Sequence, residues 1–306
     1  MLFKIVHLKI STQRIMSYLT LRIFLGALIL LVACQPDKPS EEAYEFSENN
    51  MTASTDANPS SLMAIKENGV LRVGTAITDP FEYYDQESGE LIGYDVDLMN
   101  RIAEELNVKI EWTEMSFAGL LPSIQDRNVD VAIAAIYIKT EREEVVDFSE
   151  PYIQTGLVMA VRPELVSSVK SIDDLTGLKV GVKIGATGAE LAQDLVDRGI
   201  DIEIVEYKDT LSSLLDLEVG RLEVVFNDYL NTLKYISDAN SDLQIVLDEN
   251  NEINFLSNVG LGIAVHKGEV ELLSIINRTL DRMLQNGKLE RLKEKWINPK
   301  VMEKTK

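Results

Sequence analysis

The chain has 306 residues, a length that allows one large domain or two ordinary ones. Hydrophobic residues make up 45% of the sequence and charged residues 26%, so we expect a sizeable packed core. The formal net charge of −20 repels phosphate backbones and anionic lipid headgroups, and we therefore expect no nucleic-acid binding.

Few side chains in the sequence suit metal or nucleophilic chemistry. One cysteine (Cys34) and two histidines (His7 and His266) are too few for a standard zinc site. No Ser/Cys-His pair has the spacing of nucleophilic catalysis, and no GxxxxGKS/T phosphate loop occurs. The sequence thus predicts a protein without a metal, a cofactor or an enzyme activity.

The amino end has the pattern of an export signal. Residues 1–22 are basic, and residues 23–33 (IFLGALILLVA) are continuously apolar. At about 1.5 Å per residue the apolar segment spans roughly 16 Å, well short of the ~30 Å hydrocarbon core of a bilayer. We therefore predict a signal peptide over residues 1–33 rather than a transmembrane helix.

The end of the apolar segment, LVAC at residues 31–34, resembles the lipobox of bacterial lipoproteins, in which the cysteine becomes the new amino terminus and carries lipid. The residues that follow, up to position 60, are rich in Pro, Ser, Asn, Thr and acids, and cannot bury enough apolar surface to fold. We predict that Cys34 is a lipid anchor and that residues 34–60 form a disordered tether.

From Ser61 onward, strand and helix patterns alternate in two successive α/β units. In the first unit we expect helices at 61–68, 94–106 and 117–125, and strands at 70–75, 81–84, 109–113, 131–136 and 145–148. In the second we expect strands at 157–161, 179–182, 202–207 and 222–226, and helices at 189–198, 211–219 and 229–236. A strand at 261–265 and helices at 269–285 and 288–296 complete the chain. This order predicts parallel sheets with right-handed crossovers.

Three features stand at strand ends or at a helix start, where α/β proteins bind ligands. Arg142 follows the central strand of the first unit and suits bidentate pairing with a carboxylate. In the second unit, the turn at 185–188 opens a helix and can bind an anion through its N–H groups, and Asp228 can pair with an ammonium. Together these groups match a free α-amino acid. Taken singly, each has a simpler reading, as a surface ion pair, a plain turn and a helix cap.

Several segments in the same order resemble those of the family 3 extracellular solute-binding proteins, the amino-acid receptors of ABC importers. The resemblance runs from about Ser61 to Trp296. Its motifs are GYDVDLMNRIA at 93–103, SFAGLLP at 116–122, TER at 140–142, VDFS at 146–149 and FND at 226–228.

The resemblance implies an α/β, two-lobed periplasmic-binding-protein-like fold of type II. Each lobe would be a mixed, mostly parallel sheet flanked by helices, and two crossing strands at 152–156 and 258–262 would join them. Lobe 1 would then comprise residues 61–153 and 263–306, and lobe 2 residues 154–262 including the hinge strands.

The resemblance also implies a ligand site. Arg142 matches the carboxylate-binding arginine, Asp228 the ammonium-binding aspartate, and Thr187 a hydroxyl residue at a helix start. The remaining positions would bind or flank the ligand: Phe117 packing on its side chain, Ala135 through its carbonyl, Lys183 and Asn227 beside the side-chain pocket, and Asp79 and Phe81 in the opening turn.

Two departures from the family pattern concern specificity. Tyr137 stands where the family usually has a Ser or Thr that contacts the ammonium, and the turn at 75–80 is short and lacks an aromatic residue before its proline. Tyr137 either fills the vacated space or alters the pocket for a different ligand. A polar amino acid is the first expectation.

The resemblance therefore predicts a monomeric, lipid-anchored extracytoplasmic receptor that delivers a polar amino acid to the membrane subunits of an ABC importer. One alternative is a ligand-sensing subunit of a signalling receptor. Another is a dehydratase-type enzyme on the same scaffold, which would need a general acid over the ligand; Glu82, Asp79 and Lys183 are the candidates.

Overall fold

The structure, a computed structural model, describes residues 61–297. Its first sheet has the strand order β4-β1-β5-β13-β6. Strands β4 and β5 run parallel to β1, whereas β13 runs antiparallel to both β5 and β6. The strand bounds are β1 (Val70–Thr75), β4 (Lys109–Glu114), β5 (Val131–Ala132), β6 (Val146–Phe148) and β13 (Ala264–His266).

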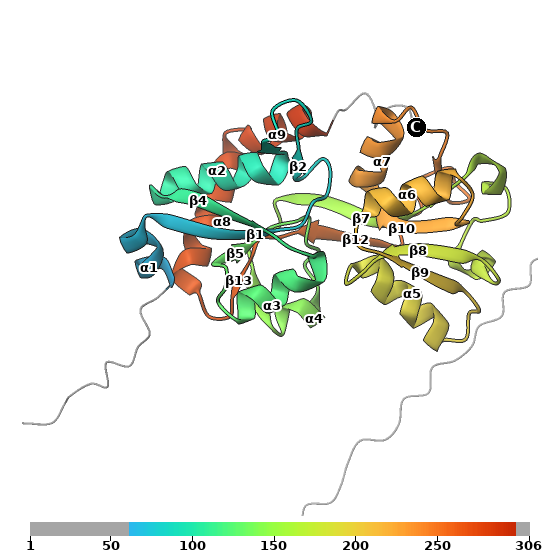
Figure 1. The fold of residues 1–306 in the computed structure, drawn as a ribbon, viewed down its shortest axis with the longest axis horizontal. Helices are drawn as coiled ribbons and strands as arrows, with labels where there is room; N and C mark the ends of the chain where they lie inside the picture. Colours follow the sequence, from blue (N-terminus) through green and yellow to red (C-terminus); the bar gives the residue numbers. More distant parts are fainter. Residues whose placement is uncertain (1–60, 298–306) are drawn as a thin grey trace, which may run out of the picture. The chain divides into compact units, whose positions relative to one another are not determined.

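Helices cover both faces of this sheet (Figure 1). They are α1 (Ser61–Asn68), α2 (Tyr94–Leu106), α3 (Leu120–Gln125), the short α4 (Thr140–Glu143), α8 (Val270–Gln285) and α9 (Lys288–Trp296). Helix α2 buries Leu98, Met99, Ile102 and Leu106, whose spacing of three and four residues places them on one face. A small hairpin, β2 (Tyr83–Tyr84) with β3 (Leu91–Ile92), precedes α2.

The second sheet has the order β11-β7-β10-β8-β9, with β12 paired to β7. Strands β10, β8 and β9 run parallel, and β7 runs antiparallel to β10. Helices α5 (Thr187–Asp197) and α6 (Thr210–Glu218) lie on opposite sides of this sheet, and α7 (Tyr229–Asp238) follows β10 (Figure 1). The strand bounds are β7 (Ile153–Val161), β8 (Lys179–Lys183), β9 (Glu203–Tyr207), β10 (Val224–Asp228), β11 (Gln244–Ile245) and β12 (Ser257–Leu261).

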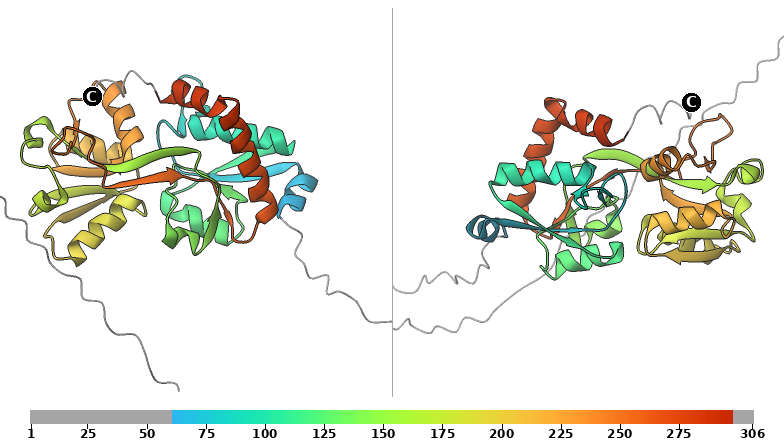
Figure 2. Two further views of the ribbon diagram at one scale, coloured as in Figure 1. Left: turned by 180° about the vertical axis from the view of Figure 1, so that it is seen from behind. Right: turned by 45° about the horizontal axis from the view of Figure 1, so that its top comes forward.

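Strands β7 and β12 carry the chain from one sheet to the other and back (Figure 2). They pair antiparallel from Ser257↔Leu157 to Leu261↔Ile153, so ladder hydrogen bonds join the two crossings to each other. Two mixed sheets, flanked by helices and joined by two crossing strands, form the architecture predicted from the sequence.

Several predicted elements differ in extent. The strand expected at 131–136 ends at Ala132, because Ala135 has a φ of 49° and donates its N–H to Asp95 instead of to a neighbouring strand. The crossing at 152–156 and the strand at 157–161 form one continuous strand, β7. The strand expected at 261–265 is split between β12 and β13.

Two helix starts also differ. The helix expected at 117–125 begins as a 3₁₀ turn, Phe117–Gly119, before α3. Helix α6 is capped by Asp209, whose carboxylate accepts from the N–H of Ser212, so the helix begins at Thr210, one residue before the predicted start.

The signal peptide, Cys34 and the tether lie outside the described residues. Within residues 61–297 no helix is long and apolar enough to cross a membrane.

Two carboxyl groups, those of Glu82 and Asp95, are fully buried beside each other behind the first sheet. Asp95 Oδ2 accepts from the Ala135 N–H at 3.0 Å and from the Tyr152 hydroxyl at 2.9 Å. Neither oxygen of Glu82 has a hydrogen-bond partner among the described residues. Burial, together with the charge of Asp95, raises the pKa of Glu82 well above its usual range, and burial raises the pKa of Asp95 to about 6. Asp95, which accepts two hydrogen bonds, is thus the better-stabilised anion of the pair. Its Oδ2 atom connects Ala135 with Tyr152, the residue before β7.

Gly156 allows the two crossing strands to approach each other. A Cβ at this position would lie 2.2 Å from the Ser257 carbonyl oxygen and 2.4 Å from the Phe255 ring. Because that carbonyl belongs to the paired strand β12, it cannot move without disturbing the ladder. We expect Gly156→Ala to lower the free energy of unfolding by about 1–3 kcal/mol in urea titrations. Gln154→Ala, on the same strand with an exposed side chain, is the control; equal stability of the two variants would contradict the contact.

The buried carboxyl pair predicts a pH dependence of stability. The folded-state pKa of Glu82 is raised, so protonation of Glu82 stabilises the fold. This stabilisation is fully present below the unfolded-state pKa, near 4, and is lost as pH rises through the folded-state pKa. We therefore expect Glu82→Gln to gain at least about 1 kcal/mol relative to wild type between pH 5 and pH 8, measured by urea unfolding. Glu67→Gln, an exposed change on α1, controls for the loss of one charge. Parallel pH profiles of Glu82→Gln and wild type would show that Glu82 does not titrate in the fold.

Candidate functional site

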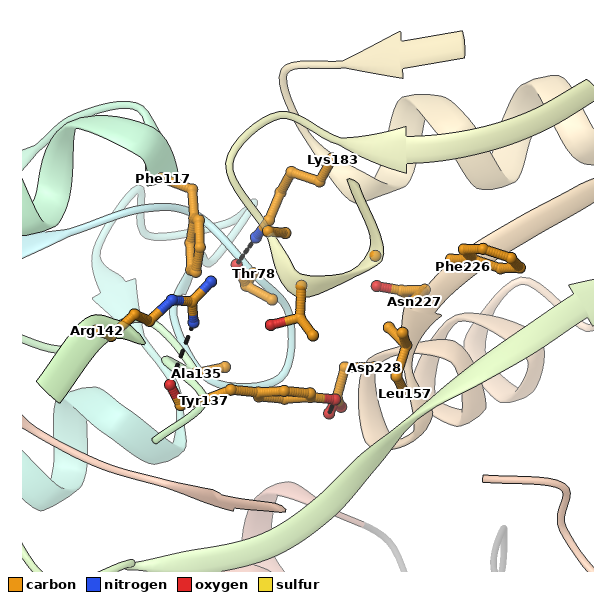
Figure 3. Close-up of a pocket in the computed structure, with 13 residues that line it drawn as sticks. Thr78, Phe117, Ala135, Tyr137, Arg142, Leu157, Lys183, Phe226, Asn227 and Asp228 are labelled. Carbon is orange, nitrogen blue, oxygen red and sulfur yellow. Dashed lines mark hydrogen bonds between the residues drawn. The ribbon is translucent and has the colours of Figure 1, made fainter. Parts of the chain in front are cut away.

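A small pocket of about 50 Å³ lies between the elements of the two sheets (Figure 3). Its residues come from loops after β1 and β5, from the 3₁₀ turn Phe117–Gly119 and α4, and from β7, β8, β10 and the start of α5. They are Thr78, Phe117, Ala135, Tyr137, Arg142, Leu157, Lys183, Ala186, Thr187, Gly188, Phe226, Asn227 and Asp228. Eight of the ten residues predicted to bind a ligand are therefore gathered around one cavity.

Arg142 stands on the short helix α4 with only 7% of its surface exposed. Its guanidinium donates to the Tyr137 carbonyl at 3.2 Å, to the Gly185 carbonyl at 3.3 Å and to Glu190 Oε1 at 3.2 Å. Burial lowers the pKa of Arg142 and Glu190 opposes that shift, but arginine stays charged. The simple surface ion pair is thus the wrong reading, because Arg142 is buried and its partners lie on α5 and the turn before it.

Asp228 ends β10 and caps helix α7. Its Oδ1 accepts from the N–H groups of Leu230 at 2.8 Å and Asn231 at 3.1 Å. Its Oδ2 accepts from the hydroxyls of Tyr137 and Thr155, both at 2.8 Å. Burial raises the pKa of Asp228, and these four donors oppose the shift. Asp228 therefore both caps helix α7 and forms part of the pocket wall.

Tyr137 extends along one side of the pocket to Asp228 (Figure 3). It is 5% exposed, and burial raises the pKa of its hydroxyl well above the usual range, so the hydroxyl stays protonated and donates to Asp228. Its carbonyl accepts from Arg142. Tyr137 thus occupies the space beside Asp228 and connects Asp228 with Arg142.

Lys183, the last residue of β8, reaches across to the first sheet's side of the pocket. Its ammonium lies 4.3 Å from the centroid of the Phe117 ring and donates to Thr78 Oγ1 at 3.1 Å. The Arg142 guanidinium carbon lies 5.6 Å from the same centroid, so both cations contact one aromatic ring. Burial lowers the pKa of Lys183 to about 8.

The turn at residues 185–188 brings the start of α5 to the pocket. Gly185 has a φ of 74°, and a Cβ there would lie 2.7 Å from Ala118 Cβ, so only glycine allows this close packing. Ala186 stands at the N-cap and provides no side-chain hydrogen bond to the first turn. The N–H groups at the start of α5, next to Thr187, can therefore bind an anion.

The structure does not bring Asp79 and Phe81 to the pocket. Phe81 is fully buried against Tyr94, because the turn folds back through hydrogen bonds from Phe81 N to Thr78 O and from Thr78 N to Glu82 O, both 2.8 Å. Asp79 faces α7, where its Oδ1 lies 3.9 Å from Lys234 Nζ. Thr78 takes the place in the pocket that was predicted for these two residues.

Sequence reasoning missed two hydroxyl residues of the site. Thr78 follows β1, and the rule that ligands bind beyond strand ends could have identified it. Thr155 lies within β7, and its bond to Asp228 depends on the register between strands β7 and β10. No local pattern in the sequence indicates that contact.

The arrangement suits binding rather than reaction. Two cations, one carboxylate and the start of α5 surround the cavity, together with Phe117, Leu157 and Phe226. Among residues 61–297, no group of three or more His, Cys, Asp or Glu side chains could hold a metal ion. Of the three candidate general acids, only Lys183 lines the pocket.

Known proteins with binding functions resemble this chain. The L-cystine-binding protein TcyJ of Escherichia coli K12 is 30% identical over 251 residues, which cover 82% of this chain and 91% of that protein. The L-arginine-binding protein of Pseudomonas aeruginosa is 31% identical over 233 residues, 74% of this chain and 88% of that one. The crystal structure of AbpA from Streptococcus pneumoniae, an amino acid ABC transporter substrate-binding protein bound to L-arginine, superposes with a TM-score of 0.71. That structure is 28% identical and covers 78% of this chain and 99% of its own.

These relatives are named as binding proteins, not enzymes, and this supports the binding reading of the pocket. Residues 71–299 match the sequence profile of the bacterial extracellular solute-binding proteins, family 3. The match spans the β1 strand, both sheets and the last helix, which together contain every residue of the pocket. The chain therefore belongs to the bacterial extracellular solute-binding proteins, family 3.

Proposed function

We propose that this protein is the extracytoplasmic receptor of an ABC importer for an amino acid. The observation that carries the proposal is the pair of buried charges in one pocket, Arg142 on the side of the first sheet and Asp228 on the side of the second. An α-amino acid carries a carboxylate and an ammonium at close range, and a cation and an anion across a small cavity complement both. The names of the similar binding proteins support the same class of ligand.

In this proposal, the ligand's α-carboxylate binds Arg142 and the N–H groups at the start of α5. Glu190 accepts from Arg142 at 3.2 Å and is 43% exposed, so a ligand carboxylate can replace it while Glu190 turns to water. The ammonium binds beside Asp228, where the Tyr137 oxygen can accept once its proton points to the carboxylate. Each ligand charge thus replaces an existing contact, and no buried group of the site is left unpaired.

The lobes of this receptor are proposed as residues 61–153 with 263–306, and residues 154–262. Because β7 and β12 are the strands that pass between them, we propose that the lobes close around the ligand by bending at these strands. Membership of an extracellular binding-protein family supports a location outside the cytoplasm. We further propose that lipid on Cys34 holds the receptor at the membrane, with residues 34–60 as the tether.

The two other functions considered have less support. A dehydratase would need a general acid over the ligand, but Glu82 is buried outside the pocket and Asp79 faces Lys234. A sensing subunit would use the same pocket for the same ligand, and differs only in the membrane partner that the loaded protein contacts. The similarity to an ABC transporter substrate-binding protein favours the importer.

Substituting Arg142 tests the ligand site. We expect Arg142→Ala to weaken binding of the cognate amino acid at least about 30-fold, because the ligand carboxylate loses its buried partner. The cognate ligand is first identified by a thermal-shift screen of the common amino acids, since a ligand that binds only the folded state raises the melting temperature. Isothermal titration calorimetry then gives the two affinities.

Arg101→Ala is the control for this experiment, because Arg101 is exposed on α2 and pairs with Glu104 away from the pocket. It should bind as the wild type does. Unchanged affinity in Arg142→Ala, with binding otherwise intact, would overturn the assigned site.

Substituting Cys34 tests the anchor. We expect Cys34→Ser, expressed in a bacterium, to leave the membrane fraction and to lose labelling by radioactive palmitate, because serine has no thiol to carry the lipid. Ser40→Ala, a change within the same tether, should stay in the membrane fraction and keep its label. Persistent labelling of Cys34→Ser would disprove the proposed lipidation site.

A further inference from the structure

The pocket carries more positive than negative charge. Arg142 and Lys183 both line it, whereas Asp228 is its one carboxylate among the lining residues. The start of α5 adds the partial positive charge of a helix N-terminus. A ligand of net charge zero would leave this excess unbalanced in a site that is largely closed to water.

The single negative charge of the pocket is already compensated within the protein. Asp228 accepts four hydrogen bonds, two from hydroxyls and two from N–H groups at the start of α7. Four is about the full acceptor capacity of a carboxylate. Asp228 therefore has little capacity left to balance Lys183 as well.

Lys183 lacks a comparable partner. Among the described residues no carboxylate forms an ion pair with its ammonium, whose hydrogen bond goes to the neutral hydroxyl of Thr78. Glu82 lies nearby, but both of its oxygens lack hydrogen-bond partners and Asp95 lies beside it, so two adjacent buried carboxyls cannot both hold a charge. An ammonium has three donors, and at least one of those of Lys183 is free to bind a ligand.

We propose that the ligand is an acidic amino acid, whose α-carboxylate binds Arg142 and whose side-chain carboxylate binds Lys183. This inference builds on the proposed receptor function and narrows its ligand to one charge class. Phe117 lies against both cations, at 5.6 Å and 4.3 Å, so the two carboxylates would bind beside the same ring.

The same geometry disfavours a basic ligand. A guanidinium or ammonium on the ligand side chain would enter a cavity that already holds Lys183, and like charges at short range repel strongly in a poorly hydrated site. The arginine bound by AbpA is therefore not the ligand expected for this chain. A neutral amide such as glutamine could accept one hydrogen bond from Lys183 but would not balance its charge.

The experiment measures the binding of four ligands to the full-length protein, purified in detergent. Calorimetric titrations use L-aspartate, L-glutamate, L-glutamine and L-arginine with wild type and with Lys183→Met, which keeps an unbranched side chain, one atom shorter, and removes its charge. We expect wild type to bind an acidic amino acid at least about 30-fold more tightly than glutamine or arginine. Lys183→Met should lose at least about 30-fold for the acidic ligand and change by less than about threefold for glutamine.

Lys139→Met is the matched control. Lys139 is a cation near Arg142 that pairs with Glu141 and Glu190 but does not line the pocket. It should keep the preference for the acidic ligand, which would show that the effect belongs to Lys183 and not to the net charge of the region.

A pH series adds a second test, because the pH dependence of affinity would not change if Lys183 had only a structural role. Because burial lowers the pKa of Lys183 to about 8, affinity for the acidic ligand should fall as pH rises above about 8, and this fall should be absent in Lys183→Met. The groups that face Lys183 are Glu82 before β2, Asp209 before α6, Asp228 at the end of β10 and Arg142 in α4. Since Lys183→Met retains all four, any fall in affinity that it still shows would come from these groups or from the α-ammonium of the ligand, which also loses its proton at high pH.

The outcomes separate the two proposals. Tight binding of arginine or glutamine with weak or no binding of the acids would overturn the acidic ligand and leave the receptor function standing. Unchanged acid affinity in Lys183→Met would also overturn the role of Lys183. Binding of no amino acid at all would overturn both the receptor function and the charge class of its ligand.

Discussion

The carboxylate of Asp228 connects more of this molecule than any other single group of the pocket. It caps α7, it accepts a hydroxyl from Thr155 on the crossing strand, and it accepts another from Tyr137 on the side of the first sheet. A helix, a crossing strand and the opposite wall of the pocket therefore meet at two oxygen atoms. Burying a carboxylate is costly unless donors surround it, and these four donors stabilise its charge. The position of Tyr137 fits this need, because its hydroxyl gives Oδ2 a second donor beside the hydroxyl of Thr155.

The second constraint is the crossing of β7 and β12. The pairing of β7 with β10 fixes Thr155 relative to Asp228, and the bridge between Tyr137 and Leu261 fixes the loop after β5 against β12. Asp95 adds a further contact, since one of its oxygens accepts hydrogen bonds from both the Ala135 N–H and the Tyr152 hydroxyl. The backbone that carries Ala135 and Tyr137 is therefore positioned by contacts with the crossing strands and with the residue before β7. Any bending at these strands would also move that wall of the pocket.

The sequence was sufficient for the architecture and for most of the pocket. Arg142, Lys183 and Asp228 follow or end strands, and the carboxyl ends of strands are where α/β folds place their ligands. It was not sufficient for the opening turn, where two backbone hydrogen bonds turn Thr78 toward the pocket and Phe81 into the core. Nor could it assign the partner of the Tyr137 hydroxyl, which lies 91 residues away in the chain. Such contacts depend on how the two sheets face each other, and no local pattern encodes that.

In this structure, internal partners already occupy the charged groups of the pocket. Glu190 accepts from Arg142, Tyr137 donates to Asp228, and Thr78 accepts from Lys183. Ligand binding then exchanges an internal partner of each charged group for a group of the ligand. The free energy of binding depends on how strongly each internal partner interacted before it was replaced. A carboxylate already neutralises Arg142, and four donors satisfy Asp228, so a ligand gains little at these positions beyond what it replaces. Lys183 has only a neutral hydroxyl and an aromatic ring. The largest difference between one ligand and another should therefore arise at Lys183, because a carboxylate placed there adds an ion pair that no residue lining the pocket supplies.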